Sequence, residues 1–573
     1  MNSVKLAKTP LTLSLILCIT LYFNVVDAFF NLTCRCFPGD SCWPTTHQWD
    51  NFNMTIEGRL IATVPIASYC HNDAFAPYDE QKCAHLKSIW GFPKTHYESS
   101  SSIMAPYFAN QSCDPFLARD APCRIGTHVQ YTVNATNFFD IQKTIAFSKE
   151  HNIRLVIRNT GHDYLGKSTG PGALGIWTHH FKDIEVIDYS SRYYTGKAVK
   201  VGAGVQMFEI NEVVHAHNLV VVGGNCQTIG FAGGYSQGGG HGQLASTFGL
   251  AADQILEFEV ITSETKILTA SQSLNEDLYW ALAGGGGGTF GVVLSMTSKA
   301  HPELRTAAAN LTFTNAGISR DTFFNAAKIF ITGLGPILDA GGVSIWLLTE
   351  SMFTTTPTTI PGGSKDQLQK LMDPILQTLK RDNVTYRYFI EDFPSYYESY
   401  QVMNPVSNIT EAQLGGRLIP RSLLDSSPGV IMNAFRNILT LKNTALLSGV
   451  SVNVSRQADV QRNSVNPAWR DAAIDLVVGT SWNYTNWDND LANRELITNK
   501  LLPELEKITP GGGAYLNEAD SAQPDWKQVF YGSNYDRLRD IKQKYDPDDT
   551  FYAITAVGSE HWTQKADGRL CTS

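Results

Sequence analysis

The spacing of hydrophobic and polar residues divides the chain into three parts. Residues 29 to about 120 keep no regular period and are rich in Pro, Ser and Asn, which predicts a loop-rich N-terminal head. Between 121 and 304, short apolar runs alternate with helical periodicity, as in βα units. Beyond about 305 come long alternating strands and amphipathic helices, an order typical of an antiparallel sheet covered by helices on one face.

The same patterns place individual elements. Helices are predicted over 137–151, from about Gln206 onward, and over 277–282, 321–334, 365–381 and 495–508. Strands are predicted over 153–158, 198–202, 219–222, 309–314, 343–349, 384–391, 445–454 and 474–482.

An apolar stretch near the N-terminus has the features of an export signal. Lys5 and Lys8 precede the apolar residues 11–23, and Val26-Asp27-Ala28 supplies compact residues at the usual cleavage position. This predicts a secretory signal peptide over 1–28. The alternative is a membrane anchor, but this run is short for a bilayer, which needs about 20 apolar residues. We therefore expect a soluble mature chain, extracellular or in the secretory lumen.

Composition narrows the partners. The 573 residues are 43% hydrophobic, enough for a large core, which excludes a disordered chain. The net charge is −9 without charged blocks, so nucleic acid is not an expected partner. Only 17% of residues are charged, and glycans on sequons would hydrate such a surface. The nine sequons begin at Asn31, Asn53, Asn110, Asn134, Asn310, Asn383, Asn408, Asn453 and Asn483.

The ten cysteines fit an oxidising compartment. Cys18 lies in the predicted signal peptide, seven more lie between 34 and 123, Cys571 is near the C-terminus and Cys226 stands alone. A metal site is the alternative for Cys34, Cys36 and Cys42, but disulfides are favoured and no metal is expected. Eight of the nine mature cysteines can pair, and position predicts that Cys226 is the unpaired one.

Three glycine-bearing segments carry the candidate chemistry. The first, Arg158 to Gly166, follows a strand and could hold a phosphate or a flavin edge with backbone N–H groups; an ordinary turn explains it equally well. The second, Gly223 to Gly242, has nine glycines in twenty residues, with apolar residues interleaved, so it is not a linker. Bare backbone of this density favours close approach to a pyrophosphate-bearing cofactor.

The third segment, Gly284 to Gly291, contains a G-x-G-x-x-G spacing but fails the dinucleotide-fold context. A predicted helix precedes it, and no acidic residue follows about 20 positions on. A nicotinamide dehydrogenase is therefore the weaker interpretation. H-E-x-x-H does not occur, which removes the simplest zinc-protease option.

Together these motifs resemble the vanillyl-alcohol oxidase/p-cresol methylhydroxylase superfamily, and within it the secreted fungal members of the berberine bridge enzyme-like branch. The resemblance covers about 120 to 560. It is carried by R-N-T-G-H-D-Y around His162, N-C-Q-T-I-G with the glycines after Cys226, F-G-L-A-A-D at 248–253, D-L-Y-W-A-L at 277–282, F-Y-G-S-N-Y-D-R-L at 530–538 and K-Y-D-P at 544–547.

The resemblance implies an α+β fold. A p-cresol methylhydroxylase-type FAD-binding domain of two α/β subdomains would span 121–304, and a substrate domain with a helix-covered antiparallel sheet would span 305–510. The disulfide-stapled head over 29–120 would pack on the FAD domain. The segment 511–573 would return to it.

The resemblance also implies a cofactor and its ligands. FAD would be attached twice, through His162 to its 8α-methyl group and through Cys226 to its C6 atom. The other residues expected at the cofactor are Arg158, Asn159, Thr160, Gly161, Asp163, Thr228, Gly230, Gly233, Gly234, Tyr235, Gly238, Gly239, Gly242, Ala252, Asp253, Gly291, Val292 and Asn534.

By the same resemblance the chain oxidises a small molecule by hydride transfer to FAD, which O₂ or another acceptor reoxidises. Tyr164 would lie on the substrate side, and Tyr515 and Asp475 are candidates for the base, although a packed strand tyrosine and a solvent-facing strand carboxylate explain them at least as well. Ile229 replaces the valine of fast oxidases, so slow oxygen use is expected. A non-redox cyclase or isomerase, or a cysteine-rich binding glycoprotein without cofactor, are the alternatives; a monomer is expected.

Overall fold

The structure is a computed structural model that describes residues 33–72, 75–404, 408, 412–455 and 462–573. The predicted signal peptide and Asn31 lie outside these residues. Within them, no helix has the length and apolar character needed to cross a bilayer.

Two sheets build the half of the molecule that follows the head. The first has the order β1 (Leu60–Ala62), β2 (Tyr131–Asn134), β4 (Leu174–Trp177), β3 (Leu155–Arg158), and β2, β4 and β3 are parallel. The second is antiparallel, with the order β5 (Ile184–Ser190), β6 (Thr195–Gly202), β10 (Val292–Lys299), β8 (Ile255–Ile261), β9 (Ile267–Ser271). The helices of this half are α6 (Phe138–Glu150), α7 (Met207–Ala216), α8 (Ala245–Phe248) and α9 (Glu276–Leu282).

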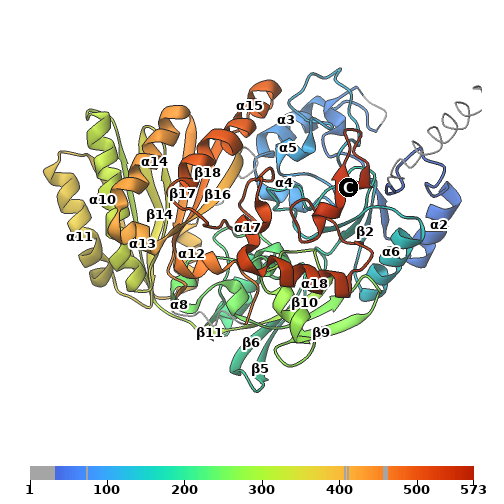
Figure 1. Cartoon of the computed structure of the whole chain (residues 1–573), viewed down its shortest axis with the longest axis horizontal. Helices are drawn as coiled ribbons and strands as arrows, with labels where there is room; N and C mark the ends of the chain where they lie inside the picture. Colours follow the sequence, from blue (N-terminus) through green and yellow to red (C-terminus); the bar gives the residue numbers. More distant parts are fainter. Residues whose placement is uncertain (1–32, 73–74, 405–407, 409–411, 456–461) are drawn as a thin grey trace, which may run out of the picture.

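A seven-stranded antiparallel sheet forms the other half, as predicted. Its order is β15 (Tyr386–Phe393), β12 (Thr306–Thr314), β14 (Met352–Pro361), β13 (Val343–Leu348), β17 (Ala445–Ser451), β18 (Ala472–Ser481), β16 (Ala412–Pro420). The helices of this half are α10 (Arg320–Asp339), α11 (Lys365–Arg381), α12 (Tyr396–Met403), α13 (Arg421–Ser426), α14 (Pro428–Leu441), α15 (Trp487–Leu496) and α16 (Leu502–Glu506). In Figure 1, α10, α11, α13 and α14 are stacked beside this sheet.

Strand β18 shows how the two faces of this sheet differ. Ile474, Leu476 and Val478 are buried in the apolar cluster that the covering helices share. Because side chains alternate along a strand, Asp475 points to the opposite face. On that face Leu418 and Val450 join the core that contains Phe231 and Tyr515. The uncovered face therefore packs against the half that carries the glycine-rich segment.

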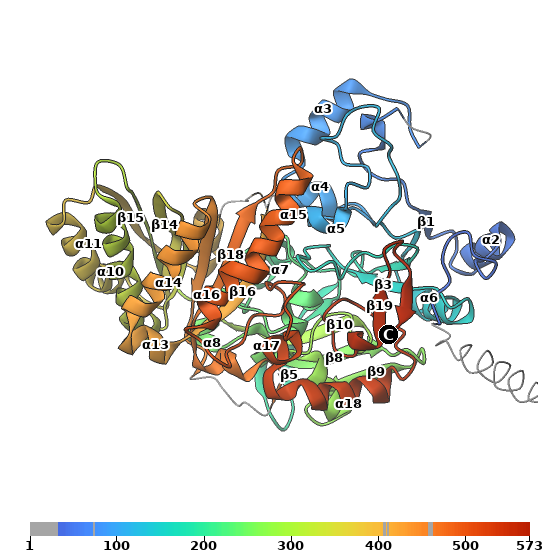
Figure 2. The ribbon, with the colours of Figure 1, turned by 45° about the horizontal axis from the view of Figure 1, so that its top comes forward.

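The head is a set of short helices, α2 (Thr46–Thr55), α3 (Glu80–Ile89), α4 (Pro93–Tyr97) and α5 (Pro106–Ala109). Figure 2 shows α4 and α5 beside α15 of the half that contains the seven-stranded sheet. The Trp90 indole N–H donates to the Tyr484 hydroxyl across this contact (3.1 Å). The head therefore contacts both halves of the molecule.

Four disulfides form, and Cys226 is the free cysteine of the described chain, as predicted. They join Cys36 to Cys42, Cys70 to Cys83, Cys113 to Cys123 and Cys34 to Cys571. The last one ties the C-terminal segment, with α17 (Trp526–Tyr531), α18 (Tyr535–Tyr545), β19 (Trp562–Gln564) and β20 (Leu570–Thr572), to the start of the head. The α+β fold class is confirmed.

Candidate active site

A deep cavity lies where the glycine-rich segments meet. It encloses about 1400 Å³ of empty space, part of it open to solvent. The loop after β3, the segment 226–237, the third glycine run and two stretches of the C-terminal segment form its wall. Predicted residues in the wall are Asn159, Thr160, Gly161, His162, Asp163, Tyr164, Cys226, Ile229, Gly230, Gly233, Gly234, Tyr235, Gly291 and Tyr515.

The two predicted tether residues share one partner. The His162 Nε2 atom is 2.7 Å from the Thr228 hydroxyl, and the Cys226 Sγ atom is 3.5 Å from the same oxygen. Burial lowers the pKa of His162 to about 3. The imidazole is therefore neutral, as a nucleophile must be. Residues 64 positions apart in sequence, His162 and Cys226, thus present a neutral imidazole and a free thiol to one cavity.

The wall also presents polar groups that the protein leaves unpaired. The Asn159 amide donates to the Ala203 carbonyl and the Thr178 hydroxyl, but its Oδ1 atom has no partner. The Gln237 Oε1 atom and the Tyr235 hydroxyl are buried and unpaired as well. Buried polar atoms in native proteins almost always find partners, so these groups indicate a polar ligand. A side chain at Gly234 would meet nothing within 4 Å, which leaves bare backbone at the cavity. Both features fit FAD.

Ten predicted residues lie outside the wall. They are Arg158, Thr228, Gly238, Gly239, Gly242, Ala252, Asp253, Val292, Asn534 and Asp475. Several of these residues instead make contacts within the protein. Asp253 forms a bidentate ion pair with the Arg470 guanidinium (2.7 and 2.9 Å). Asn534 donates to the carbonyls of Ser464 and Val465.

Glycine is required at 242 for a reason that the sequence did not reveal. A Cβ atom there would lie 1.9 Å from the carbonyl oxygen of Gly223, so the segment folds back on its own start. Arg158 is buried and its guanidinium donates to the His96 carbonyl (3.0 Å). Part of the glycine-rich sequence therefore serves packing between backbones, while the rest faces the cavity.

The sequence missed the part of the wall that comes from the C-terminus. Phe551, Tyr552 and Ala553 line the cavity, as do Gly287 and Gly288 of the third glycine run. Nothing in the residue types of Phe551, Tyr552 and Ala553 marks them as site residues, because tertiary packing brings them to the cavity.

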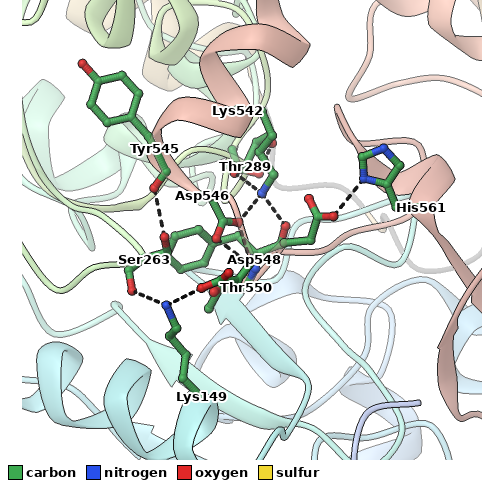
Figure 3. A network of polar contacts seen from close by, with 12 residues as sticks. Lys149, Ser263, Thr289, Lys542, Tyr545, Asp546, Asp548, Thr550 and His561 are labelled. Carbon is green, nitrogen blue, oxygen red and sulfur yellow. Dashed lines mark hydrogen bonds and ion pairs between the residues drawn. The ribbon is translucent and has the colours of Figure 1, made fainter. Parts of the chain in front are cut away.

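A buried ion pair holds this part in place (Figure 3). Lys542 on α18 forms an ion pair with Asp546 and donates to the carbonyls of Thr289 (2.9 Å) and Phe551 (2.7 Å). Asp546 accepts from the backbone N–H groups of Thr550 and Phe551 (both 2.9 Å). One lysine thus joins the third glycine run to the C-terminal wall.

One end of the cavity carries the candidate proton-transfer groups. Tyr164, Tyr515, Asn517 and Glu518 line it. Burial, and next the charge of Glu518, raise the pKa of both tyrosines well above the usual range. The tyrosines are thus neutral hydrogen-bond donors at neutral pH. Asn517 fixes the loop by donating to the Tyr515 hydroxyl (2.8 Å) and the Gly234 carbonyl (2.9 Å).

Asp475 lies behind this end, in a cluster that the sequence did not predict. The His241 Nε2 atom is 3.2 Å from Asp475 Oδ2 and 3.4 Å from Glu518 Oε2. Asp475 is 1% exposed and His241 7%, whereas the Glu518 side chain is 29% exposed to the cavity. His241 lies among glycines in the sequence, and this context does not mark it as a site residue.

Ile229 is in the cavity wall next to the predicted tethers. A Cβ atom on Gly224 would lie 2.4 Å from its Cδ1 atom, so the extra methyl of isoleucine occupies space above that glycine. Whether it limits oxygen access stays a prediction.

The sequons differ in accessibility. Asn110, Asn383, Asn408 and Asn483 are exposed, whereas Asn53, Asn134, Asn310 and Asn453 are half-buried. The Oδ1 atoms of Asn134 and Asn310 are buried within strands. The four exposed asparagines are therefore the accessible glycosylation candidates.

Fold and cavity define a flavin-dependent oxidoreductase, and comparisons with known proteins agree. The family model "FAD binding domain" matches residues 129–271, and the model "Berberine and berberine like" matches 514–558. The chain belongs to the vanillyl-alcohol oxidase-type, berberine bridge enzyme-like flavoproteins and is an FAD-linked oxidoreductase.

Particular relatives span nearly the whole chain. FAD-linked oxidoreductase sor8 of Hypocrea jecorina is 47% identical over 540 residues, covering 94% of this chain and 93% of the relative. Bifunctional decalin synthase calF of Penicillium decumbens is 40% identical, covering 94% and 95%. The crystal structure of the flavoprotein MtVAO615 from Myceliophthora thermophila superposes with a TM-score of 0.89 at 39% identity, covering 94% of this chain and 100% of that one. The predicted family resemblance is confirmed.

Proposed function

We propose that this FAD-linked oxidoreductase oxidises a C–H bond next to a hydroxyl or amino group of a small organic molecule, with FAD attached through both His162 and Cys226. When bound, FAD would supply the hydride acceptor. The observation that carries the proposal is the placement of a neutral imidazole and a free thiol around Thr228 in one cavity. Two attachment points would fix the ring relative to the protein.

The chain's own residues supply the proton chemistry at the end lined by Tyr164, Tyr515 and Glu518. The tyrosines stay protonated, so they orient a substrate oxygen or nitrogen by donating to it. Asp163 also lines the cavity, but its carboxylate oxygens already accept hydrogen bonds from the backbone N–H groups of Leu165 and Ser168. Glu518 is therefore the carboxylate of this wall with capacity to accept a proton.

Secretion belongs to the same proposal. Four disulfides support an oxidising compartment, since such bonds are rare in the cytosol. The predicted leader and the exposed sequons at Asn110, Asn383 and Asn483 agree with it. Electrons would leave to O₂ slowly, or to another acceptor, because Ile229 fills space near the tethers. We expect the protein to act as a monomer.

A non-redox cyclisation or isomerisation on the same scaffold is the second candidate. The observation that favours it is the similarity to a bifunctional decalin synthase. The two candidates differ in one property, because only a redox reaction changes the oxidation state of the flavin.

The test is anaerobic mixing of the purified yellow protein with a panel of benzylic and allylic alcohols, sugars and amines. Bleaching of the flavin absorbance with one class, and the carbonyl or imine product by mass spectrometry, is the expected result. A compound that is converted to an isomer while the flavin stays oxidised would favour the second candidate and contradict the proposed oxidation.

A further inference from the structure

The cluster of His241, Asp475 and Glu518 extends from the cavity into the core. Glu518 lies in the wall, and the His241 Nε2 atom is 3.4 Å from Glu518 Oε2 and 3.2 Å from Asp475 Oδ2. Exposure of the side chains falls from 29% at Glu518 to 7% at His241 and 1% at Asp475. The three residues come from the C-terminal segment, the glycine-rich segment and β18. Three chain regions therefore meet at one point of the active site.

Asp475 has an environment that an ordinary structural carboxylate lacks. Both of its oxygens are buried without a hydrogen bond, and its polar neighbour is the His241 ring at ion-pair distance. The His241 Nδ1 atom is unpaired as well. A buried charge without donors is strongly unfavourable unless an opposite charge compensates it. The His241 cation is thus the group that compensates both carboxylates.

The surrounding charges do not take over this role. Arg417 on β16 donates to the Thr509 hydroxyl and carbonyl, and Arg470 pairs with Asp253. The other titratable groups facing the cluster are Tyr515, whose ring is 5.1 Å from the His241 ring, and Tyr164. Both tyrosines are neutral at pH 7. One cation therefore serves two carboxylates, and of these two Glu518 lines the cavity whereas Asp475 does not.

We propose that Glu518 is the catalytic residue that takes the proton from substrate, and that His241 and Asp475 are positioning residues that keep it ionised and aimed into the cavity. This rests on the proposed oxidation. The substrate O–H or N–H bond breaks, and its proton forms an O–H bond with the Glu518 carboxylate. The hydride, with its electron pair, leaves the neighbouring carbon for FAD, and the final acceptor later removes those two electrons.

The arrangement explains why two carboxylates are needed. Before the reaction Glu518 is the negative partner of the His241 cation. Once Glu518 is neutralised, Asp475 is the remaining counter-charge, so the cation is not left alone in a buried site. In line with this, burial and the charge of Glu518 raise the pKa of Asp475 to about 7, and the two carboxylates raise the pKa of His241 to about 8 against desolvation, which lowers it. Asp475 and His241 are thus the two groups of the cluster whose pKa values are raised toward or above neutrality.

The backbone is shaped to bring Glu518 to this place. A Cβ atom at position 416 of β16 would lie 2.1 Å from the Glu518 carbonyl oxygen, so Gly416 allows the loop to lie directly on the sheet. The Tyr515 carbonyl accepts from the Glu518 N–H (3.0 Å) and closes the turn. The turn places Tyr515 and Glu518 side by side in the wall.

The first test needs no substrate. Infrared spectra of the holoprotein are recorded between pH 5 and 9 for wild type, Asp475→Asn, His241→Asn and Glu518→Gln. A carbonyl band of a protonated carboxylic acid, titrating near neutrality and lost in Asp475→Asn, is expected. His241→Asn should move its midpoint up, since the cation is gone, and Glu518→Gln should move it down, since a like charge is gone. A carbonyl band that none of the three substitutions changes would overturn the proposed role of the cluster.

The second test uses the alcohol or amine that bleaches the wild-type flavin. Glu518→Gln should slow anaerobic flavin reduction by about 10²-fold or more, the usual contribution of a general base, with an unchanged flavin spectrum. Asp475→Asn and His241→Asn should shift the pH midpoint of reduction. The matched control is Asp520→Asn, a buried carboxylate of the same segment that accepts from Thr498 and Ala522 outside the cavity.

The outcomes separate the two proposals. If no compound bleaches the wild-type flavin, the proposed oxidation fails while the infrared titration still decides on the cluster. If Glu518→Gln reduces at the wild-type rate, or Asp520→Asn has the same effect as the cluster variants, the role of Glu518 is refuted. One equivalent of divalent metal that disappears in His241→Asn would show a metal site and would equally overturn the proposal.

Discussion

Lys542 is the residue whose substitution tests most directly how the C-terminal part of the cavity wall is held in place. Its side chain is 3% exposed and joins Asp546, Thr289 and Phe551, so Lys542→Met would leave a buried carboxylate without its cation. Breaking a buried pair in this way typically destabilises by about 3–5 kcal/mol. Burial alone would raise the pKa of Asp546, but Lys542 and two backbone N–H groups hold it below its usual value.

The matched control lies two residues further along the same helix. Lys544 pairs with Asp277 at 2.6 Å but is 59% exposed, and exposed pairs contribute about 0–1 kcal/mol. We therefore expect Lys542→Met to lower the free energy of unfolding in urea by about 3 kcal/mol more than Lys544→Met. Equal unfolding midpoints for the two variants would refute the assignment of Lys542 as the link between wall and core.

Three further predictions address acid stability, oxygen access and loop packing. Burial lowers the pKa of His96 and His128 to about 4, so the folded state binds fewer protons than the unfolded state between about pH 6.5 and 4. Each histidine should therefore lower the free energy of unfolding by up to about 3 kcal/mol as the pH falls through that window. A urea midpoint that stays constant from about pH 7 to 4.5 would contradict this. Ile229→Val should speed air reoxidation of photoreduced flavin severalfold in stopped-flow; an unchanged rate would show that Ile229 does not limit oxygen access. Gly416→Ala should destabilise by about 1–3 kcal/mol in urea and displace Glu518, whereas wild-type stability would mean that the sheet yields to the new methyl group.

Long periodic segments were the most predictable part of the fold. The helix predicted over 365–381 is α11, and the strand predicted over 474–482 is β18 at Ala472–Ser481. Strand β14 was missed. Its T-T-T-P-T-T run has no apolar alternation, because packing on both faces and two neighbouring strands decide its conformation instead.

The site was predictable where local motifs carry it. His162 and Cys226 were found from their motifs, and both lie in the cavity wall. Glu518 and His241 were not, since the contact between them joins residues 277 positions apart and no local pattern encodes it. Asp475 was nominated from its strand, but the structure gives it a position behind the cavity that a single strand pattern cannot indicate.

FAD is expected to be attached covalently to two residues of this chain, His162 and Cys226. The most direct measurement is the absorbance of the purified protein after acid precipitation and denaturation, followed by mass mapping of its proteolytic peptides. The yellow colour is expected to stay with the protein, and one flavin is expected to join the peptide of His162 to the peptide of Cys226. Flavin released into the supernatant, or attached at only one of these residues, would contradict it.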